Sequence, residues 1–425
     1  MLFRTLLRLK KIGVYTLVFL LSPFVMAQTS VTEYRGTVKD VDTNRELEFV
    51  SLNLKGSNIS TITNSEGDFI LKVPSSQTEG MLLVSLLGYQ TKEIPLSSLD
   101  KEDALIELKV TYESLSQISV DTYSNPEALV RTVFKQKEEN NQDQPIIMTA
   151  FYRETIKKRN RDVSLTEAVV NLNKKPYTSR AKDEVSLHKA RKSTNYRLLD
   201  TVAVKLQGGP FSTLYIDMMK YPEYIFNDNT ISAYDFKFEK STTVNNRPVY
   251  VVNFKQKEEI QDIGYYGKLY IDSESLALAS ADYSLDVSDS RLAKDLLVKK
   301  KPSNVTVYPK QADYRVNYVQ RDGKWYYGYG SVALTFIVDK KRKLFNSEYT
   351  LSSEMAITDW QVDGSDNRLT ANRKLKPTVI ISDAVSGFSD PDFWGEYNLI
   401  EPEKSIESAI NKIQRRLKRE GSSTP

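Results

Sequence analysis

ADYRVNYVQRDGKWYYGYGSVALTFIV, residues 312–338, is the stretch that decides the fold. It consists of two runs, 312–320 and 324–338, in which apolar and polar residues alternate. A period of two indicates β-strands whose two faces meet different surroundings. Between the runs, Arg321-Asp322-Gly323 contains the Asp-Gly pair that supplies the positive φ angles of a tight hairpin. The stretch therefore predicts a long antiparallel hairpin.

The same alternation continues on both sides of this hairpin. It predicts further antiparallel pairs at 146–158 with 163–173, 232–242 with 247–256, 266–272 with 277–285, and 331–339 with 344–358. Parallel pairing would need crossover helices, and the pattern shows none between these runs. One helix is expected at about 210–220, where Pro210 precedes a series of apolar residues, Phe211, Leu214, Tyr215, Met218 and Met219. Residues 146–400 are therefore predicted to form a large, curved antiparallel sheet with a helix on its concave side.

Residues 28–112 carry shorter alternating runs that are broken by turn residues. The expected strands are 33–39, 48–54, 59–63, 68–73, 81–86, 89–94 and 104–110. Seven strands in about 80 residues leave no room for helices. We therefore expect two sheets packed face to face, a seven-stranded β-sandwich.

Several motifs in this region carry a family resemblance. They are Gly36-Thr37-Val38, Phe49-Val50-Ser51-Leu52, Lys55-Gly56-Ser57, Thr63-Asn64-Ser65-Glu66-Gly67-Asp68-Phe69 and Val84-Ser85-Leu86-Leu87-Gly88-Tyr89. In this order and spacing they resemble the carboxypeptidase-regulatory-like domain, a transthyretin-like sandwich common in envelope proteins of Bacteroidota. The resemblance implies a role in folding, anchoring or interaction, with no chemistry of its own.

Two helices are expected to flank the large sheet. Ser124-Asn125-Pro126-Glu127 has the residues of a helix start, which predicts a helix at about 126–139 within a linker that spans 113–145. Pro402 opens the second, over 401–425, whose acidic start and basic end suit the helix dipole. Its apolar stripe, Ile406, Ile410, Ile413 and Leu417, either docks on the sheet of this chain or rests on an anionic membrane surface or a partner.

The first 27 residues have the pattern of a secretory signal peptide. Basic residues at 4–11 precede an apolar stretch from Ile12 to Phe24, and Val25-Met26-Ala27 ends in small residues suited to a signal peptidase. The apolar stretch is shorter than a transmembrane helix needs, and no later run approaches that length. We therefore expect an exported protein, in the periplasm or associated with the outer membrane, with no transmembrane segment in the mature chain.

The charge balance argues against a nucleic-acid partner. The formal net charge is +4, from 59 Lys and Arg against 55 Asp and Glu, but all four excess charges lie before residue 28. The mature chain has no net charge, whereas nucleic-acid binders need clustered positive charge to displace counterions.

A second resemblance concerns the large sheet. It rests on Phe151-Tyr152-Arg153-Glu154, on Gly267-Lys268-Leu269-Tyr270-Ile271-Asp272 followed by Ala277-Leu278, and on the stretch from Asp390 to Asn398. These stretches resemble a Bacteroidota envelope family whose middle region is similar to the half-barrel of periplasmic lipoprotein carriers. This resemblance implies a half-barrel-like fold and a lipid-like ligand.

The candidate ligand site is a set of aromatic residues on neighbouring strands. These are Tyr265, Tyr266, Trp325, Tyr327 and Tyr329, together with Tyr326. One interpretation is that they line one sheet face and form part of the core. The other is that they line a concave ligand groove, because Tyr and Trp offer amphipathic contact area and Gly328 and Gly330 leave space between them.

Catalytic and metal sites are not expected. The chain has no Cys, and its single histidine, His188, lies among basic residues with no nucleophile-elbow motif to pair with it. We expect no cofactor and no metal. Paired carboxylates of the kind that hydrolyse glycosides stay open, with two candidate sets: Asp282, Asp286 and Asp289, or Asp390, Asp392 and Glu396.

These observations lead to one preferred function and two alternatives. The preferred hypothesis is an exported, non-enzymatic envelope protein that binds an apolar ligand or a protein partner through its concave sheet, with the sandwich as an interaction arm. The first alternative is a structural or assembly protein at the outer membrane that binds no small ligand. The second is a carboxylate-dependent glycoside hydrolase.

Overall fold

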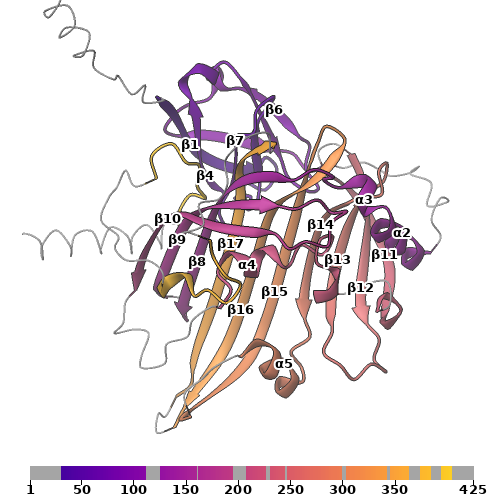
Figure 1. Ribbon diagram of the computed structural model, residues 1–425. Coiled ribbons are helices and arrows are strands. Elements are labelled where there is room, and N and C mark those ends of the chain that lie inside the picture. Colours follow the sequence, from indigo (N-terminus) through magenta and orange to yellow (C-terminus); the bar gives the residue numbers. More distant parts are fainter. Residues whose placement is uncertain are drawn as a thin grey trace, which may run out of the picture.

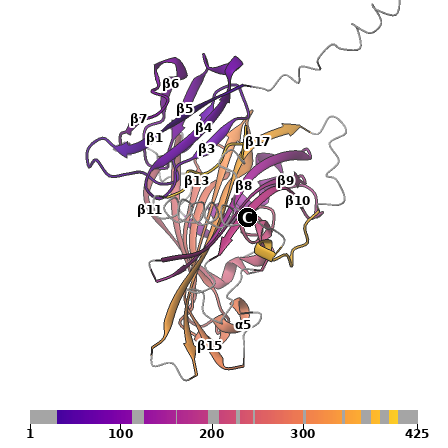
Figure 2. The ribbon, with the colours of Figure 1, turned by 90° about the vertical axis from the view of Figure 1, so that its left-hand side faces the viewer.

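The computed structural model describes residues 30–111, 125–159, 161–194, 207–225, 230–244, 247–298, 303–341, 345–362, 374–383 and 394–403. These residues form the mainly β fold that the sequence predicts, a small sandwich beside a large, curved antiparallel sheet (Figures 1 and 2). The predicted signal peptide at 1–27 lies outside the described residues, as does the C-terminal helix beyond residue 403. No helix among the described residues is both long enough and apolar enough to cross a membrane.

The N-terminal sandwich consists of a three-stranded sheet, β4-β1-β7, and a four-stranded sheet, β3-β2-β5-β6. Its strands are β1 (Val31–Asp40), β2 (Ser51–Leu54), β3 (Ser60–Ile62), β4 (Asp68–Pro74), β5 (Met81–Ser85), β6 (Lys92–Pro95) and β7 (Ala104–Leu108). The alternate residues of the strands meet between the two sheets, where Val38, Leu52 and Leu71 are fully buried. The seven predicted strands are confirmed.

The large sheet has ten strands in the order β10-β9-β8-β17-β16-β15-β14-β13-β12-β11. They are β8 (Ile146–Lys158), β9 (Arg161–Lys174), β10 (Glu184–Thr194), β11 (Tyr234–Val244), β12 (Arg247–Gln256), β13 (Tyr265–Asp272), β14 (Leu278–Leu285), β15 (Val305–Arg321), β16 (Lys324–Lys340) and β17 (Ser347–Val362). All neighbours are antiparallel, and the turn of the predicted hairpin places Asp322 and Gly323 at φ 49° and 77°. Each strand pair predicted from the sequence is present.

The strand order requires a connection across the whole sheet. The chain leaves β10 at one edge and enters β11 at the other, then meanders back until β17 pairs with β8. A short helix of this connection, α4 (Pro210–Leu214), packs on β16 and β17 near the middle of the sheet (Figure 1). We call this side of the sheet the helix-covered face and the opposite side the sandwich-facing side.

Four helices lie in the described residues. Helices α2 (Pro126–Lys135) and α3 (Lys137–Asn140) confirm the helix predicted at 126–139, and the side chain of Asn125 caps α2 as expected. Helix α5 (Ser290–Leu297), capped by Asp289, was not predicted. The remaining turns are 3-10 segments, η1 (Ser75–Gln77), η2 (Leu96–Ser98), η4 (Pro222–Tyr224), η5 (Ile231–Ala233) and η7 (Ile381–Asp383).

The helix predicted at 210–220 is shorter than expected and ends at Leu214, and Asp217, beyond its end, lies in a buried ion cluster. Its carboxylate accepts hydrogen bonds from Lys174 Nζ at 2.6 Å and from the hydroxyls of Tyr177 and Tyr318 at 2.8 Å. Lys174 also contacts Asp183 at 2.8 Å, and all three charged side chains are fully buried. This ion cluster anchors the crossing segment to β9 and β15.

On the sandwich-facing side, residues 394–403 form an extended strap between the sandwich and the sheet. The guanidinium of Arg153, on β8, donates to the carbonyl oxygens of Ile400 at 2.6 Å and Glu401 at 3.3 Å. It also pairs with Glu167 at 2.9 Å, and both side chains are buried. The amide of Asn398 exchanges two hydrogen bonds with the backbone of Lys72 in the sandwich. The strap therefore joins the two parts of the molecule.

The Lys174 cluster generates a stability prediction. Lys174→Met leaves Asp183 and Asp217 buried without their cation, which should lower the free energy of unfolding by about 3–5 kcal/mol. The matched control is Lys310→Met, which removes a solvent-exposed pair with Glu348 and should cost less than about 1 kcal/mol. Urea unfolding of both variants measures the difference, and equal losses would contradict the assignment.

A second prediction concerns Glu154, which is buried on the helix-covered face and accepts a hydrogen bond from Tyr152 at 3.1 Å. Burial raises the pKa of Glu154 from 4.5 to about 7. The folded state therefore favours the protonated acid, and this stability is present below pH 4.5 and lost as the pH rises through 7. Between pH 5 and pH 8 the wild type should lose about 2.5 kcal/mol more than Glu154→Gln, measured by urea unfolding at both values. Parallel pH profiles would contradict this.

Candidate functional site

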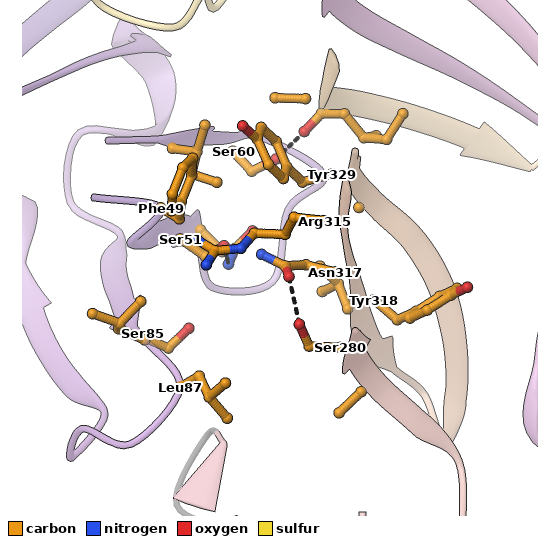
Figure 3. Close-up of a pocket in the computed structure, with 18 of the residues that line it drawn as sticks. Phe49, Ser51, Ser60, Ser85, Leu87, Ser280, Arg315, Asn317, Tyr318 and Tyr329 are labelled. Carbon is orange, nitrogen blue, oxygen red and sulfur yellow. Dashed lines mark hydrogen bonds between the residues drawn. The ribbon is translucent and has the colours of Figure 1, made fainter. Parts of the chain in front are cut away.

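A cavity of about 320 Å³ lies between the sandwich and the large sheet (Figure 3). Strands β2, β3 and β5 supply one wall, and β13 to β17 supply the other. Aromatic and aliphatic side chains such as Phe49, Ile62 and Trp360 alternate with polar ones such as Ser85 and Asn317. Its size and mixed lining are those of a site for a small ligand.

A second, more open groove of about 760 Å³ adjoins the cavity on the sandwich-facing side of β12 to β16. Phe49, Tyr270, Asp282 and Arg315 line both spaces. These four residues, which we call the partition, therefore separate the cavity from the groove.

Arg315 is the central group of the partition. Its guanidinium forms a two-pronged pair with Asp282 of the neighbouring strand, at 2.5 Å for Nε and 3.2 Å for Nη2. It also lies 4.2 Å from the centre of the Phe49 ring, in a cation–π contact that links sheet and sandwich. Burial acts to lower the pKa of Arg315, but the charge and hydrogen bond of Asp282, together with the charges of Tyr329 and Glu48, raise this pKa above its ordinary value.

Phe49 has an unusual backbone conformation. Its φ is 62°, in the left-handed region that bulky residues rarely occupy. The ring packs against Tyr329 with 5.5 Å between ring centres, and the N–H donates to the carbonyl of Thr63. The contacts with Tyr329 and Arg315 therefore hold a strained residue at the boundary of the two spaces (Figure 3).

The polar groups of the cavity are largely bonded to one another. Ser280 Oγ donates to Asn317 Oδ1 at 2.7 Å, and Asn53 donates to Ser51 at 2.8 Å. Ser60 donates to the carbonyl of Ile357 at 2.9 Å. The described residues that line the cavity include no His, and no group of three or more His, Asp or Glu side chains in the described part of the chain could hold a metal ion. The arrangement suits binding by contact and hydrogen bonds.

The predicted aromatic residues do not share one face of the sheet. Trp325 and Tyr327 are buried on the helix-covered face, where the Tyr327 hydroxyl donates to the carbonyl of Thr213 at 2.9 Å. Tyr329 lies on the opposite side and packs with Phe49. The cause is a bulge: the pairing of β15 with β16 shifts at Gly328, so the alternation changes face there.

The two tyrosines on β13 also separate. Tyr265 packs with Tyr283 and Tyr314 against the core of the helix-covered face. Tyr266 is 46% exposed and lines the open groove. Of the five, Tyr329 therefore lines the cavity and Tyr266 the groove, while the ligand-binding role of all five stays a prediction.

The candidate carboxylates have structural partners. Asp282 pairs with Arg315, Asp289 caps α5, and Asp286 accepts a hydrogen bond from the N–H of Ser288. Of the second set, Asp390 and Asp392 lie outside the described residues. His188 contacts the hydroxyl of Tyr397 at 2.8 Å, away from the cavity lining.

Sequence reasoning did not identify Phe49 or Arg315 as site residues. Phe49 belongs to the family motif Phe49-Val50-Ser51-Leu52. A positive φ is usually indicated by Gly or Asn at the position, and this position has neither. Arg315 is one of many charged residues in alternating strands. The signal that could have found it is its position in the strand, since it follows Asp313 and precedes Asn317 on the same side of β15.

The comparisons agree with the sandwich assignment. Residues 34–120 match the family model of the CarboxypepD_reg-like domain. No curated protein gave a significant match. Similar solved structures include a DUF1329 family protein from Desulfovibrio piger, at 12% identity over 59% of this chain and 99% of that chain, with a TM-score of 0.23. A LolA superfamily protein from Nitrosomonas europaea shows 8% identity over 57% and 97%, with a TM-score of 0.24. Lipovitellin shows 6% identity over 55% and 27%, with a TM-score of 0.26.

The strain at Phe49 can be tested by substitution. At an ordinary strand position, a variant with Gly has a free energy of unfolding about 0.5–1 kcal/mol lower than the variant with Ala. At φ 62° the order should reverse, and Phe49→Gly should be more stable than Phe49→Ala by about 1 kcal/mol. Phe69, buried in β4 and absent from the positive-φ residues, is the control and should keep the ordinary order. The four free energies of unfolding, measured in urea, decide this; the ordinary order at both sites would contradict the assigned conformation.

Proposed function

We propose that this chain is an exported, non-enzymatic binding protein of the bacterial envelope that holds a small amphipathic ligand between its sandwich and its sheet. The observation that carries the proposal is the cavity of about 320 Å³, whose apolar and hydroxyl-bearing walls come from both parts of the molecule. Export rests on the signal-peptide pattern of residues 1–27. In this proposal the sandwich is an interaction arm because it supplies one wall of the site.

The lining supports an amphipathic ligand rather than a purely apolar one. Leu86, Leu87 and Ile357 offer aliphatic contact, while Arg315 marks the end of the cavity that adjoins the groove. An apolar group would lie against the aliphatic residues, and a polar group would reach the partition. Because the Arg315 guanidinium is already paired with Asp282, the site does not require an anionic ligand.

The predicted aromatic groove on the helix-covered face receives less support. Trp325 and Tyr327 are 1% and 0% exposed, and α4 packs on the strand that carries them. The exposed surface that a ligand needs is therefore better supplied on the sandwich-facing side. A peripheral membrane contact or an envelope partner stays part of the proposal through the chain beyond residue 403.

The test is native mass spectrometry of the mature chain purified from its native envelope. We expect a stoichiometric small-molecule adduct on the wild type. Ser85→Phe, which places a ring inside the cavity, should reduce the adduct at least tenfold, while Ser97→Phe, on the exposed surface of the sandwich, should leave it unchanged. Circular dichroism and urea unfolding check that both variants fold.

Two results would count against the proposal. An adduct that survives Ser85→Phe in a folded protein would place the ligand elsewhere. A wild type without any adduct would favour the alternative, an assembly protein that works through protein contacts. The strap holds the sandwich against the sheet through hydrogen bonds of Arg153 and Asn398. This observation favours the alternative.

A further inference from the structure

We propose that the open groove beside the cavity is a binding site for an uncharged oligosaccharide. The groove, of about 760 Å³, runs over β12 to β16 and ends against Glu48 and Phe49 of the sandwich. This inference does not depend on what occupies the cavity, because the groove opens to solvent on its own side of the partition. It rests on three properties of the lining.

The first property is the lack of large aliphatic side chains among the described lining residues. None of the described residues that line the groove is Leu, Ile, Val or Met, although these types dominate both cores. An acyl chain or an apolar peptide side chain would therefore find aromatic rings but none of the larger aliphatic side chains. Apart from Gly267 and Ala333, the lining consists of aromatic, amide, hydroxyl and charged side chains, which suit a ligand covered with polar groups.

The second property is the cancellation of charge. Three basic residues, Lys255, Lys268 and Arg315, line the groove with three acidic ones, Glu48, Asp282 and Asp313. Three of the six are held in local pairs: Arg315 with Asp282 at 2.5 Å, and Lys268 with Glu239, which lies outside the lining, at 2.6 Å. The groove therefore has no net charge that would select an anionic or cationic ligand.

These pairs place donors beside acceptors. Ser284 donates to Asp313 at 2.7 Å on the next strand, and the amide of Asn253 lies opposite Lys268 in the strand pairing. A sugar hydroxyl is both a donor and an acceptor, so adjacent hydroxyls can bond to an acid and a base at the same time. An uncharged ligand with many hydroxyl groups can therefore bond to both the donors and the acceptors of the groove, whereas the oxygens of a phosphate would bond mainly to the donors.

The third property is the pair of tyrosines on β13. Tyr266 and Tyr270 lie on the same side of the strand, roughly 13 Å apart along it by strand geometry, with Lys268 between them. Tyr266 is 46% exposed and Tyr270 is half-buried. An aromatic ring offers an apolar face to the C–H groups of a sugar ring and a hydroxyl to its polar edge.

The experiment is isothermal titration calorimetry of the mature chain with neutral oligosaccharides. The probes are hexasaccharides of β-1,4-glucose, β-1,3-glucose, β-1,4-N-acetylglucosamine and α-1,4-glucose. We expect at least one to bind with a Kd below 1 mM, and raising NaCl from 50 to 500 mM should change this Kd less than threefold, because the ligand is uncharged.

Variants locate the binding surface. Tyr266→Ala should weaken binding at least tenfold, whereas Tyr266→Phe, which keeps the ring, should stay within threefold of the wild type. The matched control is Tyr308→Ala, since Tyr308 is 43% exposed but lies outside the groove. Ser85→Phe, which fills the cavity, should leave oligosaccharide binding unchanged, so this test and that of the proposed function can fail separately.

Three outcomes would overturn the inference. One is the absence of binding for all four hexasaccharides at millimolar concentration. Another is binding that Tyr266→Ala leaves intact, which would place the site elsewhere. The last is preferential, salt-sensitive binding of an anionic probe such as a heparin hexasaccharide, which would make the groove an anion site.

Discussion

The buried guanidinium of Arg153 is the interaction on which the arrangement of the two parts depends. It lies in the interior of the sheet with 2% of its side chain exposed, so its charge must be matched where it lies. Glu167 and Glu354 supply the counter-charges, and the carbonyl oxygens of Ile400 and Glu401 accept two further hydrogen bonds. Two of the five hydrogen bonds of this guanidinium go to the strap, so the strap cannot leave without removing two acceptors from a buried cation.

The strap in turn positions the sandwich. Thr61 donates to the carbonyl of Leu399 and Asn64 to that of Glu401, while the Glu401 carboxylate pairs with Arg35 at 3.1 Å. These contacts place one wall of the cavity at a set distance from the other. The position of this wall therefore depends on hydrogen bonds between groups more than 240 residues apart in the sequence, Arg153 and the strap.

The local parts of this structure could be predicted from the sequence, and the long-range parts could not. Alternation and the Asp322-Gly323 turn were enough for the strands and hairpins, because both depend on neighbouring residues. The pairing of β8 with β17 and the edge position of β10 depend on how the chain returns after crossing the sheet, which no short pattern records. The bulge at Gly328 had the largest effect on the candidate site, because one additional residue moves Tyr329 to the other face.

The strained backbone of Phe49 shows why the site belongs to neither part alone. A phenylalanine at φ 62° is maintained only when its surroundings compensate the strain, and here the compensation comes from Tyr329 and Arg315 of the sheet. Arg315 in turn is oriented by Asp282 and by the Phe49 ring. A ligand that entered the cavity or the groove would therefore contact a residue whose conformation depends on the contact between the two parts.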